Sequence, residues 1–298
     1  MKLLLLGKNG QVGWELQRAL APLGEVVGLD FDSLPVAADF SRPESLRALV
    51  REVRPDIIVN AAAHTAVDKA ESEPDLARAL NASAPGVLAE EAAAGGAWLL
   101  HYSTDYIFDG SGRQPRSEDA PTGPLSVYGR TKLEGEQAIR ASGCKHLILR
   151  TSWVYGARGG NFAKTMLKLA AERDKLSVID DQIGAPTGAD LLADLSAHML
   201  RAALQAPALA GTYHAVAAGE TSWHGYARYV IEWARGHGVP IKVAPDAVLP
   251  VPTTAYPTPA KRPLNSRLAT DKLRTTFGLT LPHWQSGVER LLTEIHGR

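Results

Sequence analysis

Short runs of leucine, isoleucine and valine alternate with longer stretches of helical character over the first 150 residues of the chain. Nearly continuous apolar runs are typical of parallel strands that are buried on both faces. Their alternation with helices predicts an α/β fold, a doubly wound parallel sheet of the Rossmann type. The expected strands are Lys2–Leu6, Glu25–Leu29, Asp56–Asn60, Trp98–Ser103 and His146–Arg150, and the expected helices lie near Gly13–Ala21, Pro43–Arg51, Asp75–Gly95 and Val127–Ser142.

The same pattern predicts a division of the chain into a larger core and a smaller C-terminal domain. Residues 1–150 are expected to form the core, and residues 176–216 are expected to add further strands and a helix to it. These added elements are Leu176–Ile179, Thr212–Val216 and the helix near Thr187–Leu204. Residues 151–175 and 217–298 would then form the smaller domain.

Prolines cluster between Pro240 and Pro263, where they would interrupt helices and central strands alike. This segment is either an exposed linker or an ordered loop over a ligand. The second interpretation is favoured by the three cations within Lys261–Arg267, and the first by the breaks that prolines impose on helices and strands. The residues alone leave both open.

The composition is that of an ordinary globular protein, with 45% hydrophobic and 21% charged residues. The formal net charge is zero, which argues against nucleic-acid binding because proteins of that class are usually basic. The single cysteine, Cys144, cannot form an internal disulfide, so nothing indicates an oxidising compartment. No apolar run approaches the length of a membrane span. We therefore expect a cytoplasmic protein with neither nucleic-acid nor membrane partners.

Three glycines follow the first expected strand directly and open a helix. Gly7, Gly10 and Gly13 are spaced as GxxGxxG. Glycines allow a tight turn and a close approach of the backbone to phosphate, and the start of the helix offers unpaired N–H groups and the positive end of its dipole. A plain turn would satisfy the spacing alone, but the strand before it and the helix after it favour a site for a dinucleotide pyrophosphate.

Asp30 ends the second expected strand, where an acid can bind the hydroxyls of the adenosine ribose. Such an acid favours NADH because it would repel a 2′-phosphate. Lys8, inside the glycine loop, could offset that repulsion by pairing with the phosphate. The choice between NADH and NADPH therefore stays open.

A candidate catalytic group combines residues from two segments of the chain. Thr104 ends the fourth expected strand, at the edge where doubly wound sheets bind ligands, and Tyr128 and Lys132 stand four residues apart on the following helix. A phenol with a pKa of about 10 exchanges protons efficiently near neutrality if its pKa falls by about three units, or about 4 kcal/mol. A lysine ammonium one turn away, together with the positive charge of an oxidised nicotinamide, is expected to supply that stabilisation. The group predicts hydride transfer to a carbonyl, with the tyrosine delivering the proton.

At this point the chain resembles the extended short-chain dehydrogenase/reductases and, within them, the family of dTDP-4-dehydrorhamnose reductases. The resemblance covers nearly the whole chain and is far more specific than any one motif. The strings that carry it are Gly7–Leu16, Asn60–Asp68, Ser103–Gly110, Tyr128–Lys132, Arg150–Tyr155, Asp181–Thr187 and Arg262–Ser266.

The resemblance implies roles for the matching positions. Tyr128 would be the proton donor, Lys132 its electrostatic partner and a ribose ligand, and Thr104 a contact of the keto oxygen. Asp105 and Trp153 would lie with Thr104 in the sugar pocket. The NADPH or NADH site would be lined by Gly7, Gly10, Gln11, Val12, Gly13, Asp30, Asp39, Phe40, Ala63, His64, Thr65, Tyr102, Tyr128 and Lys132.

Members of this family are also described with a magnesium ion held by acids at a dimer interface. Glu15 and Asp190 fit that pattern, although Asp190 is shorter than the usual glutamate. The expected third acid is replaced by Leu292, and Glu289 and Glu294 are only its neighbours. A homodimer and a bound Mg²⁺ therefore stand as expectations drawn from the resemblance.

The implied function is the NAD(P)H-dependent reduction of the C4 keto group of dTDP-4-dehydro-6-deoxy-L-mannose to dTDP-L-rhamnose, for cell-surface polysaccharide. The smaller domain would bind the dTDP-sugar. Another nucleotide-sugar reductase or epimerase of the family is one alternative, and a non-catalytic regulatory subunit that keeps the dinucleotide site is another. A dehydratase would place an Asp-Glu pair after the threonine, whereas here Asp105 is the only acid beside Thr104.

Overall fold

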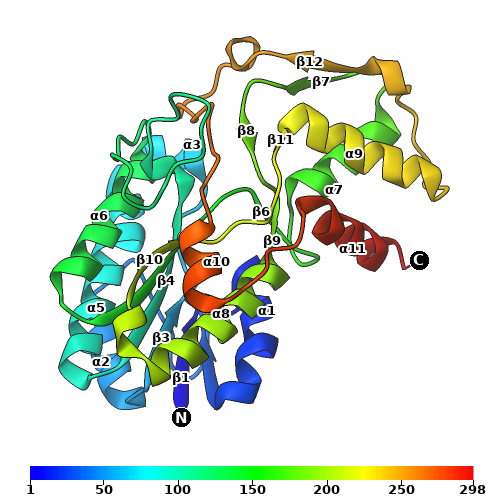
Figure 1. Cartoon of the computed structure of the whole chain (residues 1–298). Helices are drawn as coiled ribbons and strands as arrows, with labels where there is room; N and C mark the ends of the chain where they lie inside the picture. The colour runs from blue at the N-terminus through cyan, green and yellow to red at the C-terminus, as the bar shows by residue number, and fades with distance from the viewer. Residues whose placement is uncertain (298) are drawn as a thin grey trace.

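A six-stranded sheet lies at the centre of the structure, which is a computed structural model describing residues 1–297 (Figure 1). Every neighbouring pair of strands in it is parallel. The strands stand in the order β10-β5-β4-β3-β1-β2, so the chain changes direction across the sheet between β1 and β3. Their bounds are β1 (Lys2–Leu6), β2 (Glu25–Leu29), β3 (Ile57–Asn60), β4 (Trp98–Thr104), β5 (Lys145–Thr151) and β10 (Gly211–His214).

The central strands are buried on both faces, as the apolar runs predict. Leu3 and Leu5 of β1 join one hydrophobic cluster, whereas Leu4 and Leu6 join the other. Because successive side chains of a strand point to opposite faces, one run of four leucines contributes to both cores. The predicted α/β fold with a doubly wound parallel sheet is therefore confirmed.

Two layers of helices cover the sheet (Figure 1). One cluster packs Leu16 and Leu20 of α1 with Leu192 and Met199 of α8 and Leu273 of α10. The other cluster joins apolar residues of α2, α5 and α6 to the opposite face. The bounds are α1 (Gln11–Leu20), α2 (Ser45–Val53), α5 (Ala84–Gly95), α6 (Val127–Ala141), α8 (Ala189–Gln205) and α10 (Asp271–Phe277), with short 3₁₀ turns η1 (Ala21–Leu23), η3 (Asp105–Ile107) and η4 (Pro207–Leu209).

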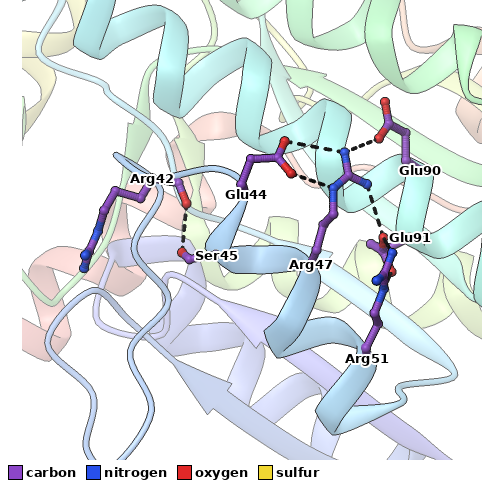
Figure 2. A network of polar contacts seen from close by, with 7 residues as sticks. All are labelled: Arg42, Glu44, Ser45, Arg47, Arg51, Glu90 and Glu91. Carbon is purple, nitrogen blue, oxygen red and sulfur yellow. Dashed lines mark hydrogen bonds and ion pairs between the residues drawn. The ribbon is translucent and has the colours of Figure 1, made fainter.

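A network of charged side chains joins α2 to α5 on the outer surface (Figure 2). Arg47 donates to Glu44, Glu90 and Glu91, and Arg51 forms two further hydrogen bonds with Glu91. The Arg51 and Arg47 guanidinium groups hold the pKa of the Glu91 carboxyl below its usual range. Exposed ion pairs contribute little to stability individually. The network joins two turns of α2 to the middle of α5.

The helix expected over Asp75–Gly95 is divided in the structure. It comprises α4 (Pro74–Arg78), a π-helical turn η2 (Ala79–Ser83) and α5, and it follows a separate short helix α3 (Val67–Ser72). Asn81 lies in the π turn, and its side chain bonds the backbone N–H and C=O of His64 and the hydroxyl of Thr131. A π turn redirects side chains within a helix and often lies near a functional site. Sequence periodicity does not predict such a turn, because its cause is this tertiary hydrogen bonding.

The smaller part of the molecule packs three helices with short two-stranded sheets (Figure 1). Aromatic and apolar residues of α7, α9 and α11 form its main cores. The elements are β6 (Val154–Tyr155), α7 (Phe162–Glu172), β7 (Leu176–Ile179), β8 (Ile183–Gly184), β9 (Thr187–Gly188), β11 (Thr221–Ser222), α9 (Trp223–Gly236), η5 (Pro245–Ala247), β12 (Val248–Val251), η6 (Thr253–Ala255) and α11 (Trp284–His296).

The structure corrects the predicted place of Leu176–Ile179. This segment is strand β7 as expected, but it pairs with β12 and adds nothing to the central sheet. The position beside β5 is taken by β10, which follows the long helix α8. In addition, α10 packs on the core of the central sheet, although it belongs to the stretch 217–298. The division into two domains itself stays a prediction.

The proline-rich stretch contains regular structure, since β12 runs parallel to β7 within it. Beyond it, Arg262 pairs with Asp68 and Arg267 pairs with Glu220, so two of the three cations are bound to acids.

Among residues 1–297 we find no helix with the length and apolar character needed to cross a membrane.

A buried ion pair joins α6 to the sheet. Glu136 is fully buried and accepts two hydrogen bonds from Arg150 of β5, at 2.9 Å and 2.8 Å. It accepts a third from the Ser103 hydroxyl of β4 at 2.6 Å. Arg150 lowers the pKa of the Glu136 carboxyl despite the opposing effect of burial. The carboxylate thus holds α6 over the ends of two neighbouring strands.

Replacing Glu136 with alanine is expected to lower the free energy of unfolding by about 3–5 kcal/mol, because it leaves a buried guanidinium without its partner. Urea-induced unfolding followed by circular dichroism measures this change. Glu44→Ala is the control, since it removes an exposed carboxylate of the α2 network and is expected to keep the parental unfolding midpoint. Equal effects of the two substitutions would contradict the importance of the buried pair.

Candidate active site

A cleft of about 860 Å³ opens at the carboxyl ends of the central strands. It lies where the strand order reverses, which is the usual ligand position in doubly wound sheets. Trp153 and Trp223 extend its lining into the smaller part of the molecule. Of the predicted site residues, it is lined by Gly7, Gly10, Gln11, Val12, Asp30, Asp39, Phe40, Ala63, Thr65, Tyr102, Thr104, Asp105, Tyr128, Lys132 and Trp153.

The glycine loop forms one end of this cleft. Gly7 has a φ of +84°, and a Cβ there would lie 2.7 Å from the backbone nitrogen of Ala62. Gly10 precedes α1 without a side-chain cap, so the first N–H groups of the helix have no side-chain acceptor at that position. Gly13 does not line the cleft. It lets α1 pack on the loop, since a Cβ there would lie 1.9 Å from the Gly7 oxygen.

Asp30 lies at the end of β2 beside the glycine loop. Its carboxylate accepts the N–H of Asn9 at 3.1 Å and the N–H of Phe31 at 2.9 Å. These bonds fix the carboxylate at the rim of the cleft. Asp39 is held in turn by Ser41 and Arg42, which lower the pKa of its carboxyl.

The segment after β3 lines the cleft with small residues. Ala61, Ala62, Ala63 and Thr65 all contribute to its wall. His64 does not; its side chain is buried, and its backbone is held by Asn81 from the π turn. The predicted cofactor contact of His64 therefore stays a prediction, whereas its neighbours Ala63 and Thr65 line the cleft.

Helix α6 brings Tyr128 and Lys132 to the end of β4. Ser126 caps the helix by accepting the N–H of Gly129 at 3.2 Å. Gly129 allows α6 to approach η3 closely, since a Cβ there would lie 2.2 Å from the Tyr106 oxygen. Tyr128 and Thr104 consequently line the same cleft, and the Thr104 hydroxyl acts to lower the pKa of the Tyr128 phenol. Thr104 also donates to Asp105 at 3.2 Å.

The expected lowering of the Tyr128 pKa stays a prediction, because it depends on the charge of the oxidised nicotinamide as well as on Lys132. Burial raises the pKa of the phenol to about 12, and the Thr104 hydroxyl opposes that rise only in part. The Lys132 amine is directed toward β4, where it donates to the Tyr102 carbonyl at 2.5 Å and lies 3.2 Å from His101 Nε2. Lysine spacing on a helix does not reveal which neighbour the amine contacts. A neutral phenol is nevertheless the form that can donate a proton.

Tyr102 of β4 contacts both the cleft and helix α8. Its hydroxyl bonds Ser196 of α8 at 2.5 Å, and the residue also lines the cleft. Burial raises the pKa of this hydroxyl, so it remains protonated. The residue therefore joins the cofactor end of the cleft to the helix layer below.

The far wall of the cleft is aromatic. Trp153 follows β5 with a φ of +50°, a left-handed conformation that is unusual for a large side chain. Its ring stacks on Trp223 at 3.6 Å between ring centroids. Gly184 makes room for it, because a Cβ there would lie 2.8 Å from the indole. Strain of this kind is found at functional sites held by their surroundings.

Sequence reasoning missed several residues that line the cleft. Trp223 begins α9, far along the chain from the other site residues, and no motif marks it. Tyr106 follows the Ser103–Asp105 string directly and could have been included on that ground. The further lining residues are Phe31, Ala38, Ser41, Ala61, Ala62, Val67, Leu76, Leu80, Ser103, Thr151, Ser152 and Val154.

Three buried oxygens on the cleft lining have no hydrogen-bond partner among the residues described: Gln11 Oε1, Asp105 Oδ2 and Thr151 Oγ1. Buried polar atoms of proteins are normally paired. Together with the glycine loop, these atoms fit a site for a polar ligand such as a dinucleotide and a sugar.

Glu15 and Asp190 lie outside this cleft. Both line a second cleft of about 400 Å³ formed by α1, α8 and α11, as does Glu294. Glu15 pairs with Arg18 at 3.5 Å and Asp190 pairs with Arg290 at 3.4 Å. Within residues 1–297, no group of three possible ligands is arranged to hold a metal ion. The expected Mg²⁺ site is therefore not supported, because arginines already neutralise the acids.

Comparisons with known proteins agree with this geometry. The model of the RmlD substrate binding domain family matches residues 1–296. A dTDP-4-dehydrorhamnose reductase of Escherichia coli (strain K12) is 58% identical over 295 residues, which are 99% of this chain and 98% of the relative.

Two solved structures are similar over nearly their whole length. The dTDP-4-dehydrorhamnose reductase of Clostridium acetobutylicum has a TM-score of 0.88 at 36% identity and covers 99% of this chain and 100% of its own. That of Bacillus anthracis, solved in complex with NADP, has a TM-score of 0.86 at 35% identity and covers 98% and 99%.

Asp105 provides a test of the site's electrostatics. Burial raises the pKa of its carboxyl from 3.8 to about 7, with Ser266 and Thr104 opposing the rise. The folded protein therefore carries a penalty that grows as pH rises above the unfolded pKa and is complete above the folded pKa. Asp105→Asn should increase the free energy of unfolding by up to about 4 kcal/mol at pH 8, and by about 2–3 kcal/mol less at pH 5.

Urea unfolding at the two pH values measures this difference. Asp109→Asn is the control, because Ser111 and Arg116 hold the pKa of its carboxyl below the usual range. That substitution should lower stability by nearly the same amount at pH 5 and at pH 8, because both values lie above the unfolded pKa of about 3.9. A destabilisation by Asp105→Asn that grows with pH would contradict the raised pKa.

Proposed function

The chain belongs to the dTDP-4-dehydrorhamnose reductase family, and we propose that it reduces the C4 keto group of dTDP-4-dehydro-6-deoxy-L-mannose to give dTDP-L-rhamnose. Relatives of that name at 58% identity over nearly the full length support this activity. The product would serve cell-surface polysaccharide synthesis. The observation that carries the proposal is that Thr104, Tyr128 and Lys132 line the same cleft as the glycine loop.

A nicotinamide dinucleotide fits the end of the cleft formed by β1, β2 and β3. The uncapped start of α1 and the close-packed loop at Gly7 suit a pyrophosphate, which helix N-termini bind through N–H groups and the dipole. Asp30 would hold the adenosine ribose, and Lys132 the nicotinamide ribose. When bound, the cofactor supplies the hydride. The complex of the Bacillus anthracis relative with NADP supports a cofactor of this class.

Tyr128 would give its proton to the oxygen of the reduced carbonyl. Thr104, which lines the same cleft as the phenol, would hold the keto oxygen and stabilise the charge that develops on it. Because the phenol has a raised pKa, it is protonated at neutral pH and ready to donate. Each proton given to the product must then be replaced from the protein side.

Asp105 and Trp153 would bind the sugar. The partnerless Oδ2 of Asp105 lies on the cleft lining and can bond a sugar hydroxyl. The stacked pair of Trp153 and Trp223 offers an apolar wall, and we add Trp223 to the proposed sugar site on that basis. The homodimer, the cytoplasmic location and the absence of nucleic-acid and membrane partners stay predictions.

Tyr128→Phe tests the proposal directly. Loss of the proton donor should lower kcat by about 10²–10⁴-fold, while binding of the reduced cofactor is retained. Turnover is followed at the nicotinamide absorbance with the dTDP-4-keto sugar, and cofactor binding by its fluorescence.

The matched control is Tyr106→Phe, since Tyr106 packs edge-on against Tyr128 with ring centroids 5.5 Å apart. It should keep most of the turnover. Full activity of Tyr128→Phe would overturn the proposal. An epimerase or a non-catalytic subunit would instead show no net oxidation of the added cofactor by the unmodified protein.

Asp30 should set the choice between the two reduced cofactors. Asp30→Ala removes a carboxylate that would bond the ribose 2′-hydroxyl and repel a 2′-phosphate. It should raise the ratio of kcat/KM for NADPH to that for NADH by about tenfold, as expected for a lost charged hydrogen bond of about 1.5 kcal/mol. Asp32→Ala, which removes a neighbouring exposed acid, should leave the ratio unchanged. A shift of equal size in both variants would show a general charge effect instead.

A further inference from the structure

His101 is a buried titratable residue that has no part in the reaction as described so far. It lies on β4 and is fully buried between Asn60 of β3 and Lys132 of α6. Its Nδ1 is 3.0 Å from Asn60 Nδ2, and its Nε2 is 3.2 Å from Lys132 Nζ. The two ring nitrogens thus join the catalytic lysine to the centre of the sheet.

The orientation of the Asn60 amide decides which ring nitrogen carries the proton. Asn60 Oδ1 accepts the N–H of Ala62 at 3.1 Å, so its Nδ2 is the atom that faces His101. An amide nitrogen only donates. His101 Nδ1 must therefore accept, and in a neutral imidazole the proton then resides on Nε2.

This tautomer directs an N–H group at the Lys132 amine. An ammonium has three donors and no acceptor. If Lys132 were charged, its ammonium would face the N–H of His101 Nε2, and two donors cannot form a hydrogen bond. A neutral amine has a lone pair and accepts the bond. If the proton were on Nδ1 instead, the same clash of two donors would arise between His101 Nδ1–H and the Asn60 amide nitrogen. All hydrogen bonds of this chain of groups are therefore satisfied when Lys132 is uncharged.

We propose that His101, held by Asn60 as the Nε2–H tautomer, is a positioning residue that stabilises the neutral amine of Lys132 and so eases release of its proton toward Tyr128. This inference rests on the proposed function, since it assigns the supply of the proton that the reduction consumes. Asn60 acts through His101, and neither residue lines the cleft.

The proton balance is simple. After Tyr128 has given its proton to the product oxygen, the ammonium of Lys132 loses one proton and becomes an amine, while the phenolate gains one proton. The phenol is restored, and the amine accepts the hydrogen bond from His101 Nε2–H. The amine later takes one proton from solvent, so the protein returns to its starting state with one solvent proton consumed per turnover.

The surrounding charges agree with this assignment. Burial lowers the pKa of Lys132 to about 8, and Glu136, one turn along α6, opposes that effect. Glu136 is itself neutralised by Arg150. Burial and the neighbouring Lys132 hold the pKa of His101 well below its usual range, so the imidazole is neutral. The titratable and charged groups that contact Lys132 or act on it are His101 on β4 and Glu136 on α6.

The tautomer is tested in the unmodified protein by nitrogen NMR of labelled histidine, with the His101 signals assigned by their loss in His101→Gln. We expect a proton on Nε2 and none on Nδ1. This measurement needs neither cofactor nor substrate, and the tautomer itself is read from the unmodified protein. A proton on Nδ1 would overturn the proposal.

The effect on Lys132 is tested with two substitutions that each present an acceptor to it. In His101→Gln the amide oxygen can face the ammonium, and in Asn60→Asp the carboxylate takes the Nδ1 proton and leaves Nε2 bare. Each should raise the pKa of Lys132, followed by carbon NMR of labelled lysine, by about one unit, or tenfold in proton affinity. The alkaline limb of the plot of kcat against pH should shift to higher pH by the same amount.

His146→Gln is the matched control, because His146 lies on β5 and bonds only the Cys144 carbonyl among the contacts described. It should leave both the lysine titration and the pH profile unchanged. An unchanged Lys132 titration in both test variants would overturn the inference. Absence of keto-sugar reduction by the unmodified protein would overturn the proposed function alone, because the two NMR results stand without it.

Discussion

The ion pair between Glu136 and Arg150 is the interaction on which the site depends. It is buried beneath α6 and reaches the ends of β4 and β5, with Ser103 as its third member. A carboxylate in such a place is stable only while its partners remain, because the desolvation of an unpaired charge costs several kcal/mol. The pair therefore fixes both the depth and the rotation of α6, and with them the positions of Tyr128 and Lys132.

Small residues and one polar turn complete that placement. Gly129 lets α6 approach η3, and Gly135 lets it approach the π turn, where a Cβ would lie 2.1 Å from the Asn81 oxygen. Asn81 in turn bonds the backbone after β3. The catalytic helix, the π turn and the wall of the cofactor end thus form one hydrogen-bonded unit, so a change in any of them is felt at the cleft.

The sequence predicts the central strands and the glycine loop well, because each depends on local pattern. A run such as Leu3–Leu6 can only be buried on both faces, and glycines at such spacing after it suit a tight turn before a helix. The candidate site was found because its groups end or follow strands of one sheet edge. The sequence does not predict Trp223 as a site residue, because it follows no strand of the central sheet. It lies at the cleft because α9 packs so that its ring stacks on Trp153.

By itself, the sequence determined the layered α/β architecture, the family and the identity of the groups at the strand ends, since hydrophobic period and motif spacing are properties of neighbouring residues. The tertiary structure alone decided the rest. It paired β7 with β12 and brought Arg18 to Glu15 and Arg290 to Asp190. It also turned the Lys132 amine toward His101. Each of these outcomes is set by which distant groups come within hydrogen-bonding distance, and that distance exists only after the chain has folded.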